Sequence, residues 1–215
     1  MSLKKIVILT LLSVFLGGIA FLILEPLNLQ AAADTVSVSQ TVIAEINVNC
    51  SSTATLPNVN GQTGGIATTT FGCTVESSNA SGWTLAIKYD HKLYTDGGGE
   101  DKEFDEYTTS TDPADYDWDS VGAGNEEFGF NVHSGANVVG TFADNGVDSC
   151  GSGSPSAWHC FYPISTTDVT IADSNSPTAS GGENYVIGLQ DEVGSNNNLQ
   201  SGSYSCTITA TATNK

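Results

Sequence analysis

The chain has 215 residues, of which 24 are acidic and six are lysine, with no arginine, and its net charge is −18 at pH 7. Proteins bind nucleic acids and anionic lipid surfaces largely through Lys and Arg, so this composition excludes a nucleic-acid partner and argues against adhesion to anionic lipid surfaces. The negative charge favours solubility and cation binding instead.

Residues 1–33 predict a secretory signal peptide. Lys4 and Lys5 form a basic start, residues 6–24 are uncharged and mostly apolar, and residues 31–33 are three alanines, which suit a cleavage site. We expect cleavage after Ala33. The alternative is an uncleaved N-terminal membrane anchor, because the 19 residues from 6 to 24 would almost cross a bilayer as a helix. Either reading places the protein outside the cytoplasm, secreted or at the cell surface.

Residues 34–215 then form the mature protein, whose length suits one domain with its own core. Loss of the leader removes two lysines and one glutamate, which leaves 23 acidic residues against four basic ones and a net charge of −19.

Alternation of apolar and polar residues predicts that this domain is all-β. The alternation is clearest over 36–50, where Val36, Val38, Val42 and Ile46 share one face. Further strands are expected at 68–76, 83–87, 128–132, 138–142, 158–162, 168–172, 185–189 and 204–213. No segment after residue 33 has the period of a helix. Eight or nine short strands favour a single antiparallel β-sandwich, immunoglobulin-like, with a jelly roll as the alternative.

Residues 91–127 interrupt the strand pattern. Twelve of the 23 acidic residues of the mature chain lie between Asp96 and Glu127, together with Gly97-Gly98-Gly99 and Pro113. Such a composition is poor in residues that can form a core, so we expect a long, solvated acidic loop.

Five cysteines in an exported chain predict two disulfides and one free thiol. Cys150 and Cys160 flank a short Gly/Ser-rich segment, and we expect them to pair. Cys50, Cys73 and Cys206 each lie on the apolar face of an expected strand, so any two of them can meet in the core. Nearness in sequence favours Cys50–Cys73. The remaining cysteine is expected to be a buried, unreactive thiol.

Within the acidic segment, four carboxylates have the spacing of positions 1, 3, 5 and 12 of an EF-hand calcium loop: Asp115, Asp117, Asp119 and Glu126. The segment departs from that pattern because Ser120 replaces the turn glycine, Tyr116 and Trp118 are bulky, and no helices flank it. The hypothesis is a calcium site; the alternative is that the aromatic rings pack onto the sandwich while the aspartates face water.

Catalytic motifs are missing from the sequence, and we expect no enzymatic activity. There is no G-x-S-x-G nucleophile elbow, and the three histidines are isolated in sequence. Trp83 belongs to the core by its place in the alternation, whereas Trp118 and Trp158 are candidates for stacking on sugar rings.

Three segments carry a resemblance: TTFGCTV at 69–75, WHCF at 158–161 and NNLQSGSYSCT at 197–207. They resemble uncharacterised exported β-sandwich surface proteins of candidate-phylum, small-genome bacteria, and the likeness covers most of the mature chain. The layout of a leader followed by one Ser/Thr-rich sandwich is also similar to secreted filament and pilin-like subunits. The resemblance implies a surface protein and no specific activity.

The sequence therefore predicts a structural or adhesive subunit of the cell envelope, which associates with itself, with other surface proteins or with glycans. The strand at 36–50 lies near the start of the mature chain, so it is a candidate for exchange between subunits by strand addition. The alternative is a calcium-dependent carbohydrate-binding module that uses the acidic loop. Deletion of 96–127 is expected to abolish binding by that loop and to leave assembly intact.

Overall fold

The structure is a computed structural model that describes Leu11, residues 35–99 and residues 101–215. The predicted cleavage site and all but one residue of the apolar run at 6–24 lie outside the described residues. The chain divides into two units, Met1–Thr41 and Val42–Lys215. In the first unit, the described residues 35–41 are exposed and form no strand. Among the residues described, no helix has the length and apolar character needed to cross a membrane.

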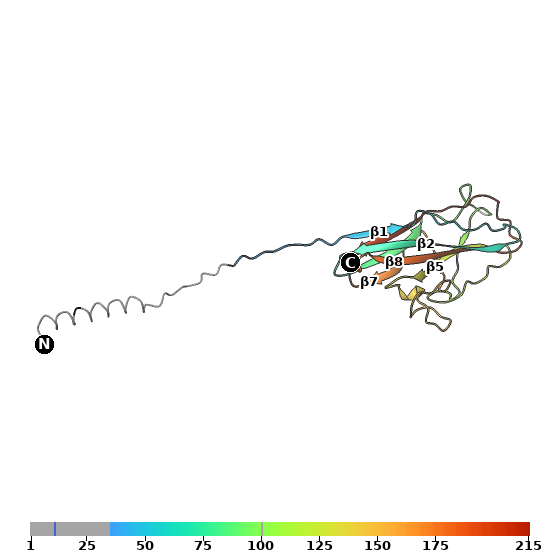
Figure 1. The fold of residues 1–215 in the computed structure, drawn as a ribbon. Helices are drawn as coiled ribbons and strands as arrows, with labels where there is room; N and C mark the ends of the chain where they lie inside the picture. Colours follow the sequence, from blue (N-terminus) through green and yellow to red (C-terminus); the bar gives the residue numbers. More distant parts are fainter. Residues whose placement is uncertain (1–10, 12–34, 100) are drawn as a thin grey trace, which may run out of the picture. The chain divides into compact units, whose positions relative to one another are not determined.

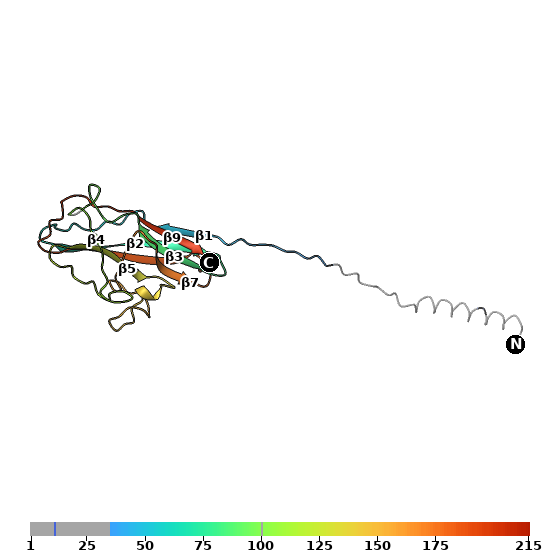
Figure 2. The same ribbon diagram turned by 180° about the vertical axis from the view of Figure 1, so that it is seen from behind.

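The second unit is built from two β-sheets (Figures 1 and 2). The larger sheet has the strand order β1-β2-β8-β5-β4, with β6 also paired to β5, and the smaller sheet has the order β7-β3-β9. In chain order the strands are β1 Ile46–Cys50, β2 Gly65–Ser77, β3 Trp83–Tyr89, β4 Asp105–Glu106, β5 Glu126–Ser134, β6 Tyr162–Pro163, β7 Val169–Ser174, β8 Glu183–Val193 and β9 Ile208–Asn214. From residue 35 onward, the described chain has no α-helix and one 3-10 turn, η1 Gly140–Phe142. The prediction that the domain after residue 33 is all-β is confirmed over the described residues.

Strands of both sheets contribute to one hydrophobic core, and alternation decides which side chains enter it. In β3, Trp83, Leu85, Ile87 and Tyr89 are all buried, while the residues between them are half-exposed. The ring of Trp83 meets the ring of Tyr185 from β8 edge to face, with centroids 6.1 Å apart. Burying each side chain of this size contributes about 1.5–3 kcal/mol, so the core dominates the stability of the domain.

The strand expected over 36–50 begins only at Ile46, and the prediction is wrong for residues 36–45. These residues alternate as β1 does, but Val36, Val38 and Val42 are 81–88% exposed. Alternation shows that a segment is suited to cover an apolar surface; a strand forms only where a neighbouring strand supplies hydrogen bonds.

The strands expected at 138–142 and 158–162 are replaced largely by loops. Gly140–Phe142 forms the 3-10 turn η1, and only Tyr162 of the second segment enters a strand, β6. Trp158 and Cys160 have left-handed backbone conformations, with φ of 61° and 60°, which a strand does not allow. Single buried side chains such as Phe142 and Phe161 anchor these loops to the domain. The last expected strand, 204–213, begins at Ile208.

The acidic segment 91–127 is not the solvated insertion that its composition predicts. Leu93, Phe104 and Tyr107 are between 1% and 7% exposed, and Leu93 and Phe104 belong to the main core. The short strand β4 also pairs with β5, in parallel. The acidic residues and the buried rings occupy different positions of the same segment, so an average over composition conceals the rings.

Candidate functional site

Asp115, the first residue of the predicted calcium loop, is a buried structural carboxylate. It is 3% exposed and accepts hydrogen bonds from the backbone N–H groups of Ser110 and Thr111 and from the hydroxyls of Ser110, Thr111 and Tyr107, at 2.7–3.0 Å. Burial alone would raise the pKa of this carboxyl, but the hydrogen bonds outweigh it and hold the pKa below its usual value. Its oxygens are therefore occupied by donors from the protein.

The other three carboxylates of the predicted calcium loop point to different partners. Asp117 is mostly exposed and lies 3.3 Å from Nδ1 of His159, and Glu126 accepts a hydrogen bond from the amide of Asn197. The backbone N–H of Asp119 donates to the hydroxyl of Tyr107 at 3.1 Å. Over residues 35–99 and 101–215, no three His, Cys, Asp or Glu side chains are grouped so that they could hold a metal ion. In this structure the four carboxylates are thus not brought together at one point, and the calcium site stays a prediction.

Two aromatic residues of the acidic segment, Tyr107 and Trp118, pack onto the larger sheet. Tyr107 stacks on Trp118 with ring centroids 4.2 Å apart, and the indole N–H of Trp118 donates to Glu192 of β8 at 2.6 Å. Gly129 of β5 makes room for this packing, because a Cβ there would lie 2.7 Å from Cβ of Tyr107. The loop thereby covers part of the sheet through Trp118, whereas Tyr116, the other ring of the predicted calcium loop, stacks on His159.

Two cysteine pairs lie at disulfide distance, and they are the pairs that the sequence favours. The sulfur atoms of Cys50 and Cys73 are 1.99 Å apart, and those of Cys150 and Cys160 are 2.15 Å apart. Cys50 and Cys73 are directly opposite each other in the ladder of β1 and β2. Cys206 is free and half-exposed, and burial together with the charge of Asp90 raises the pKa of its thiol to about 11.

Half-exposed aromatic rings gather where the loop closed by Cys150–Cys160 meets the acidic segment. Tyr116 stacks on His159 with ring centroids 4.2 Å apart, and Trp158 contacts His133 edge to face at 4.4 Å. The fully buried amide of Asn131 in β5 donates to the carbonyl of His159 at 3.0 Å and fixes this loop on the sheet. The pKa of His133 is lowered by burial. We call Tyr116, His133, Trp158 and His159 the ring surface.

The histidines do not form a catalytic pair in the described part of the chain. His91 contacts Tyr94, His133 contacts Trp158 and His159 contacts Tyr116, and none of the three hydrogen-bonds to a hydroxyl or thiol there.

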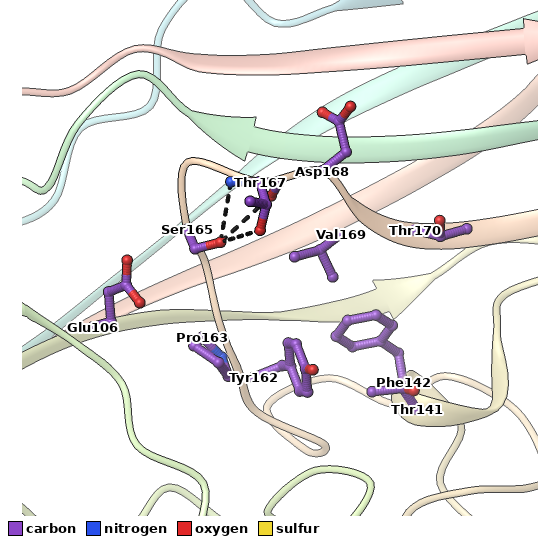
Figure 3. Close-up of a pocket in the computed structure, with 10 residues that line it drawn as sticks. All are labelled: Glu106, Thr141, Phe142, Tyr162, Pro163, Ser165, Thr167, Asp168, Val169 and Thr170. Atoms are coloured by element: carbon purple, nitrogen blue, oxygen red, sulfur yellow. Dashed lines mark hydrogen bonds between the residues drawn. The ribbon is translucent and has the colours of Figure 1, made fainter.

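A cavity of about 440 Å³ is lined by residues of β4, η1, β6 and β7 (Figure 3). Phe142, Tyr162 and Val169 form its apolar wall, and Glu106 and Asp168 lie at its border (Figure 3). Glu106 accepts a hydrogen bond from the hydroxyl of Tyr89. Ser165 interacts with Thr167 within its own turn, its oxygen 2.8 Å from the Thr167 hydroxyl (Figure 3). The lining groups can contact a ligand, but they do not place a nucleophile beside a base.

The outer edge of β9 is a further candidate binding surface, and it was not predicted from the sequence. This strand pairs with β3 on one side, and among the described residues no strand pairs with its other side. The alternation of β9 was visible in the sequence, but which edge of the strand stays unpaired depends on the order of strands in the sheet. The chain matches no protein-family model, and no curated protein is significantly similar to it.

Proposed function

We propose that the protein is a non-enzymatic, exported subunit of the cell envelope with a structural or adhesive role, built as an immunoglobulin-like β-sandwich. The sandwich is supported by the two sheets that share one core and by the contact of Trp83 from β3 with Tyr185 from β8. The first four strands of the larger sheet, in the order β1-β2-β8-β5, and the smaller sheet β7-β3-β9 suit two antiparallel layers.

The observation that carries the proposal is an exposed apolar segment in a strongly acidic chain. Residues 36–44 contain no charged residue, and Val36, Val38, Val42 and Ile43 are each 80–88% exposed. Soluble proteins that work as monomers avoid uncharged, β-prone segments of this kind, because such segments pair with other chains. A subunit that assembles at the cell surface can use such a segment to pair with a neighbouring chain.

Electron microscopy of the protein taken from the surface of the cell that makes it tests this function. We expect regular filaments or a lattice that contain the intact chain, identified by mass spectrometry of the same preparation. Dispersed monomers on the cell surface and in the medium would contradict a structural role.

A second candidate function, binding of carbohydrate, is favoured by the ring surface. Tyr116 and Trp158 are half-exposed aromatic residues of the type that stacks on sugars, and the exposed carboxylate of Asp117 lies beside them near His159. Deletion of 96–127 is unsuitable as a test, since it would remove Phe104 and Tyr107 from the interior. The sharper test is a glycan array with the wild-type protein and with Tyr116→Ala, with and without calcium.

A further inference from the structure

We infer that residues 36–44 of one copy add as a β-strand to the free edge of β9 in a second copy, and that this is how the subunits join. The inference rests on the proposed structural function and names the partner and the two surfaces involved. The donor is the exposed segment 36–44. The acceptor is the outer edge of β9 together with the half-buried side chains beside it.

The acceptor lies where the core is incompletely covered. In β9, Ile208, Ala210 and Ala212 are half-buried and contact the core, while the threonines between them are exposed. The strand β1 lies beside β9, and its own inward residues, Ile46 and Val48, are also only half-buried. A strand added at this edge would cover apolar side chains from both sheets.

The other long edge of the smaller sheet is already protected. The backbone of residues 137–139 covers β7: the N–H of Val139 donates to Ile171 at 3.1 Å, and the N–H of Asp173 donates to Asn137 at 2.9 Å. At the border of the larger sheet, β4 consists of two residues, both acidic. Short edges, charges and covering segments are the usual devices that prevent edge-to-edge pairing.

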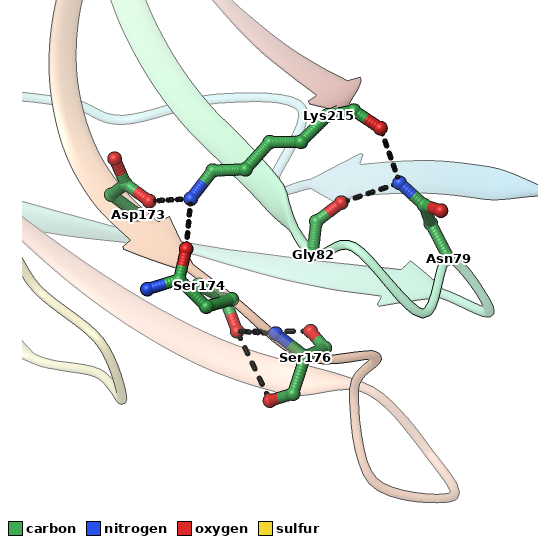
Figure 4. A network of polar contacts seen from close by, with 7 residues as sticks. Asn79, Gly82, Asp173, Ser174, Ser176 and Lys215 are labelled. Atoms are coloured by element: carbon green, nitrogen blue, oxygen red, sulfur yellow. Dashed lines mark hydrogen bonds and ion pairs between the residues drawn. The ribbon is translucent and has the colours of Figure 1, made fainter.

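The edge of β9 has none of these devices. Its seven residues, ITATATN, contain no charge and no proline, and its ladder with β3 has no bulge. Lys215 fixes the end of the strand, because its ammonium group bonds to Asp173 and Asn175 and its carbonyl accepts from Asn79 at 2.9 Å (Figure 4). The edge is therefore held firmly in place, and no strand of the described residues pairs with its outer backbone groups.

The donor matches this edge in pattern and length. Val36, Val38, Val42 and Ala44 share one face, so they can enter the core while Ser37, Ser39 and Thr41 face outward. Nine residues in a strand span about 30 Å, which is more than the roughly 23 Å of a seven-residue strand. The small inward residues Ala210 and Ala212 leave room for the larger valines. An uncharged donor also avoids repulsion by the acidic domain.

The occupant is a second copy because the segment is poorly placed to serve its own domain. Glu45 alone separates residues 36–44 from the start of β1 at Ile46. To fold back beside β1 and β9, the chain would need a hairpin of at least two turn residues, usually Gly, Asn or Asp. The sequence TVIAE at 41–45 contains none of these. One donor and one acceptor on each copy make a head-to-tail contact, which gives a ring or an open filament.

The test compares two pairs of substitutions in the full chain. Val38→Asp with Val42→Asp places two charges on the inward face of the donor, and Ser39→Asp with Thr41→Asp places the same charges on its outward face. All four positions lie before β1, so the domain folds in both variants. We expect the first variant to be monomeric by light scattering and electron microscopy, and the second to assemble as the wild type does. Equal assembly of both variants would overturn strand addition.

A peptide of residues 35–45 provides an independent measurement on the monomeric Val38→Asp, Val42→Asp protein. We expect the peptide to raise its melting temperature by about 3 °C or more at saturation and to slow hydrogen exchange in β9. The same peptide with both aspartates is the control and is expected to change neither. No effect of the wild-type peptide would overturn the inference, even if the native protein forms filaments. A wild-type protein that never assembles on the cell would contradict the structural function, and peptide binding would still decide strand addition.

Discussion

The hydroxyl of Tyr107 donates a 2.8 Å hydrogen bond to the carboxylate of Asp115 and accepts a 3.1 Å hydrogen bond from the backbone N–H of Asp119. This hydroxyl therefore connects the first and last aspartates of the segment that resembles a calcium loop. Tyr107 is 1% exposed, and Asp115 is 3% exposed. The spacing of the carboxylates reflects a buried turn that the protein closes with its own donors.

Asp115→Asn is expected to lower the free energy of unfolding by about 2 kcal/mol or more, because an amide accepts fewer hydrogen bonds than a carboxylate and adds donors that face other donors. The pKa of Asp115 is held low in the folded protein, so its contribution is present above the unfolded pKa of about 3.9 and is lost as the pH falls through the folded value. Urea unfolding at pH 7 and pH 3 measures both effects. Asp117→Asn, at a side chain 78% exposed, is the control and is expected to change stability by less than about 0.5 kcal/mol. Equal effects of the two substitutions would contradict a structural role for Asp115.

The contribution of Asp191 in β8 to stability is expected to depend on pH in the opposite direction to that of Asp115. The residue is 3% exposed, and one of its carboxylate oxygens has no hydrogen-bond partner within the described part of the chain. Burial raises its pKa to about 7, and a hydrogen bond with the backbone of Ala67 opposes this rise more weakly. Because the folded pKa exceeds the unfolded one, the protonated carboxyl stabilises the fold fully below about pH 4, and this stabilisation is lost as the pH rises through 7.

Asp191→Asn is therefore expected to make stability less dependent on pH between 5 and 8 and to increase it at pH 8, by on the order of 2–4 kcal/mol. Thermal melts of the wild type and the variant at several pH values measure the difference. Burial also raises the pKa of Glu126 and Glu127, but these groups are present in both proteins and cancel in the comparison. Asp148→Asn in an exposed loop is the matched control. A pH slope that is the same in all three proteins would contradict the assignment to Asp191.

Cys206 is expected to be the single cysteine that alkylating reagents modify in the unreduced, folded protein. Its thiol has a pKa of about 11, so alkylation should be slow at pH 8 and should accelerate about tenfold for each pH unit up to pH 10. Mass spectrometry of peptides from the unreduced protein measures the modification and the pairing together. Modification of Cys50 or Cys150 before unfolding would contradict the two disulfides of the structure.

The sequence was sufficient to predict much of the core because alternation and burial agree there. Trp83, Leu85 and Ile87 were placed on an inward face, and all three are fully buried. The same rule failed for Val36 and Val38, which alternate equally well but are not part of a strand in the structure. A single sequence contains the pattern of a strand but not the identity of the strand that pairs with it.

Two features of the acidic segment could not be seen from its composition and carboxylate spacing, both for physical reasons. Its charge concealed Phe104 and Tyr107, since two buried rings are enough to anchor a loop that is otherwise acidic. The calcium-like spacing of Asp115 concealed the nearer donors Ser110 and Thr111. An aspartate side chain can accept hydrogen bonds from backbone N–H groups a few residues away, as Asp115 does from Ser110 and Thr111.

Gly129→Ala is expected to disturb the loop that covers β5, since the new Cβ would lie 2.7 Å from Cβ of Tyr107, an atom close to the backbone that cannot easily move. We expect a loss of about 1–3 kcal/mol in the free energy of unfolding. We also expect a change in the fluorescence of Trp118, because its stacking on Tyr107 and its hydrogen bond to Glu192 depend on the position of the loop. The fluorescence is measured as the difference between proteins with Trp118 and with Trp118→Phe, which removes the contributions of Trp83 and Trp158.

Gly72→Ala in β2 is the matched control, because its Cβ would meet other atoms only at 3.7 Å or beyond. Both glycines lie inside strands, so replacing either one by alanine reduces the conformational entropy lost on folding by a similar amount. Gly72→Ala should therefore leave stability unchanged or raise it slightly, with no change in the fluorescence of Trp118. If Gly129→Ala behaves in the same way, Tyr107 does not rest on β5 in solution, and the loop is free to present Asp115 and its neighbours to a ligand.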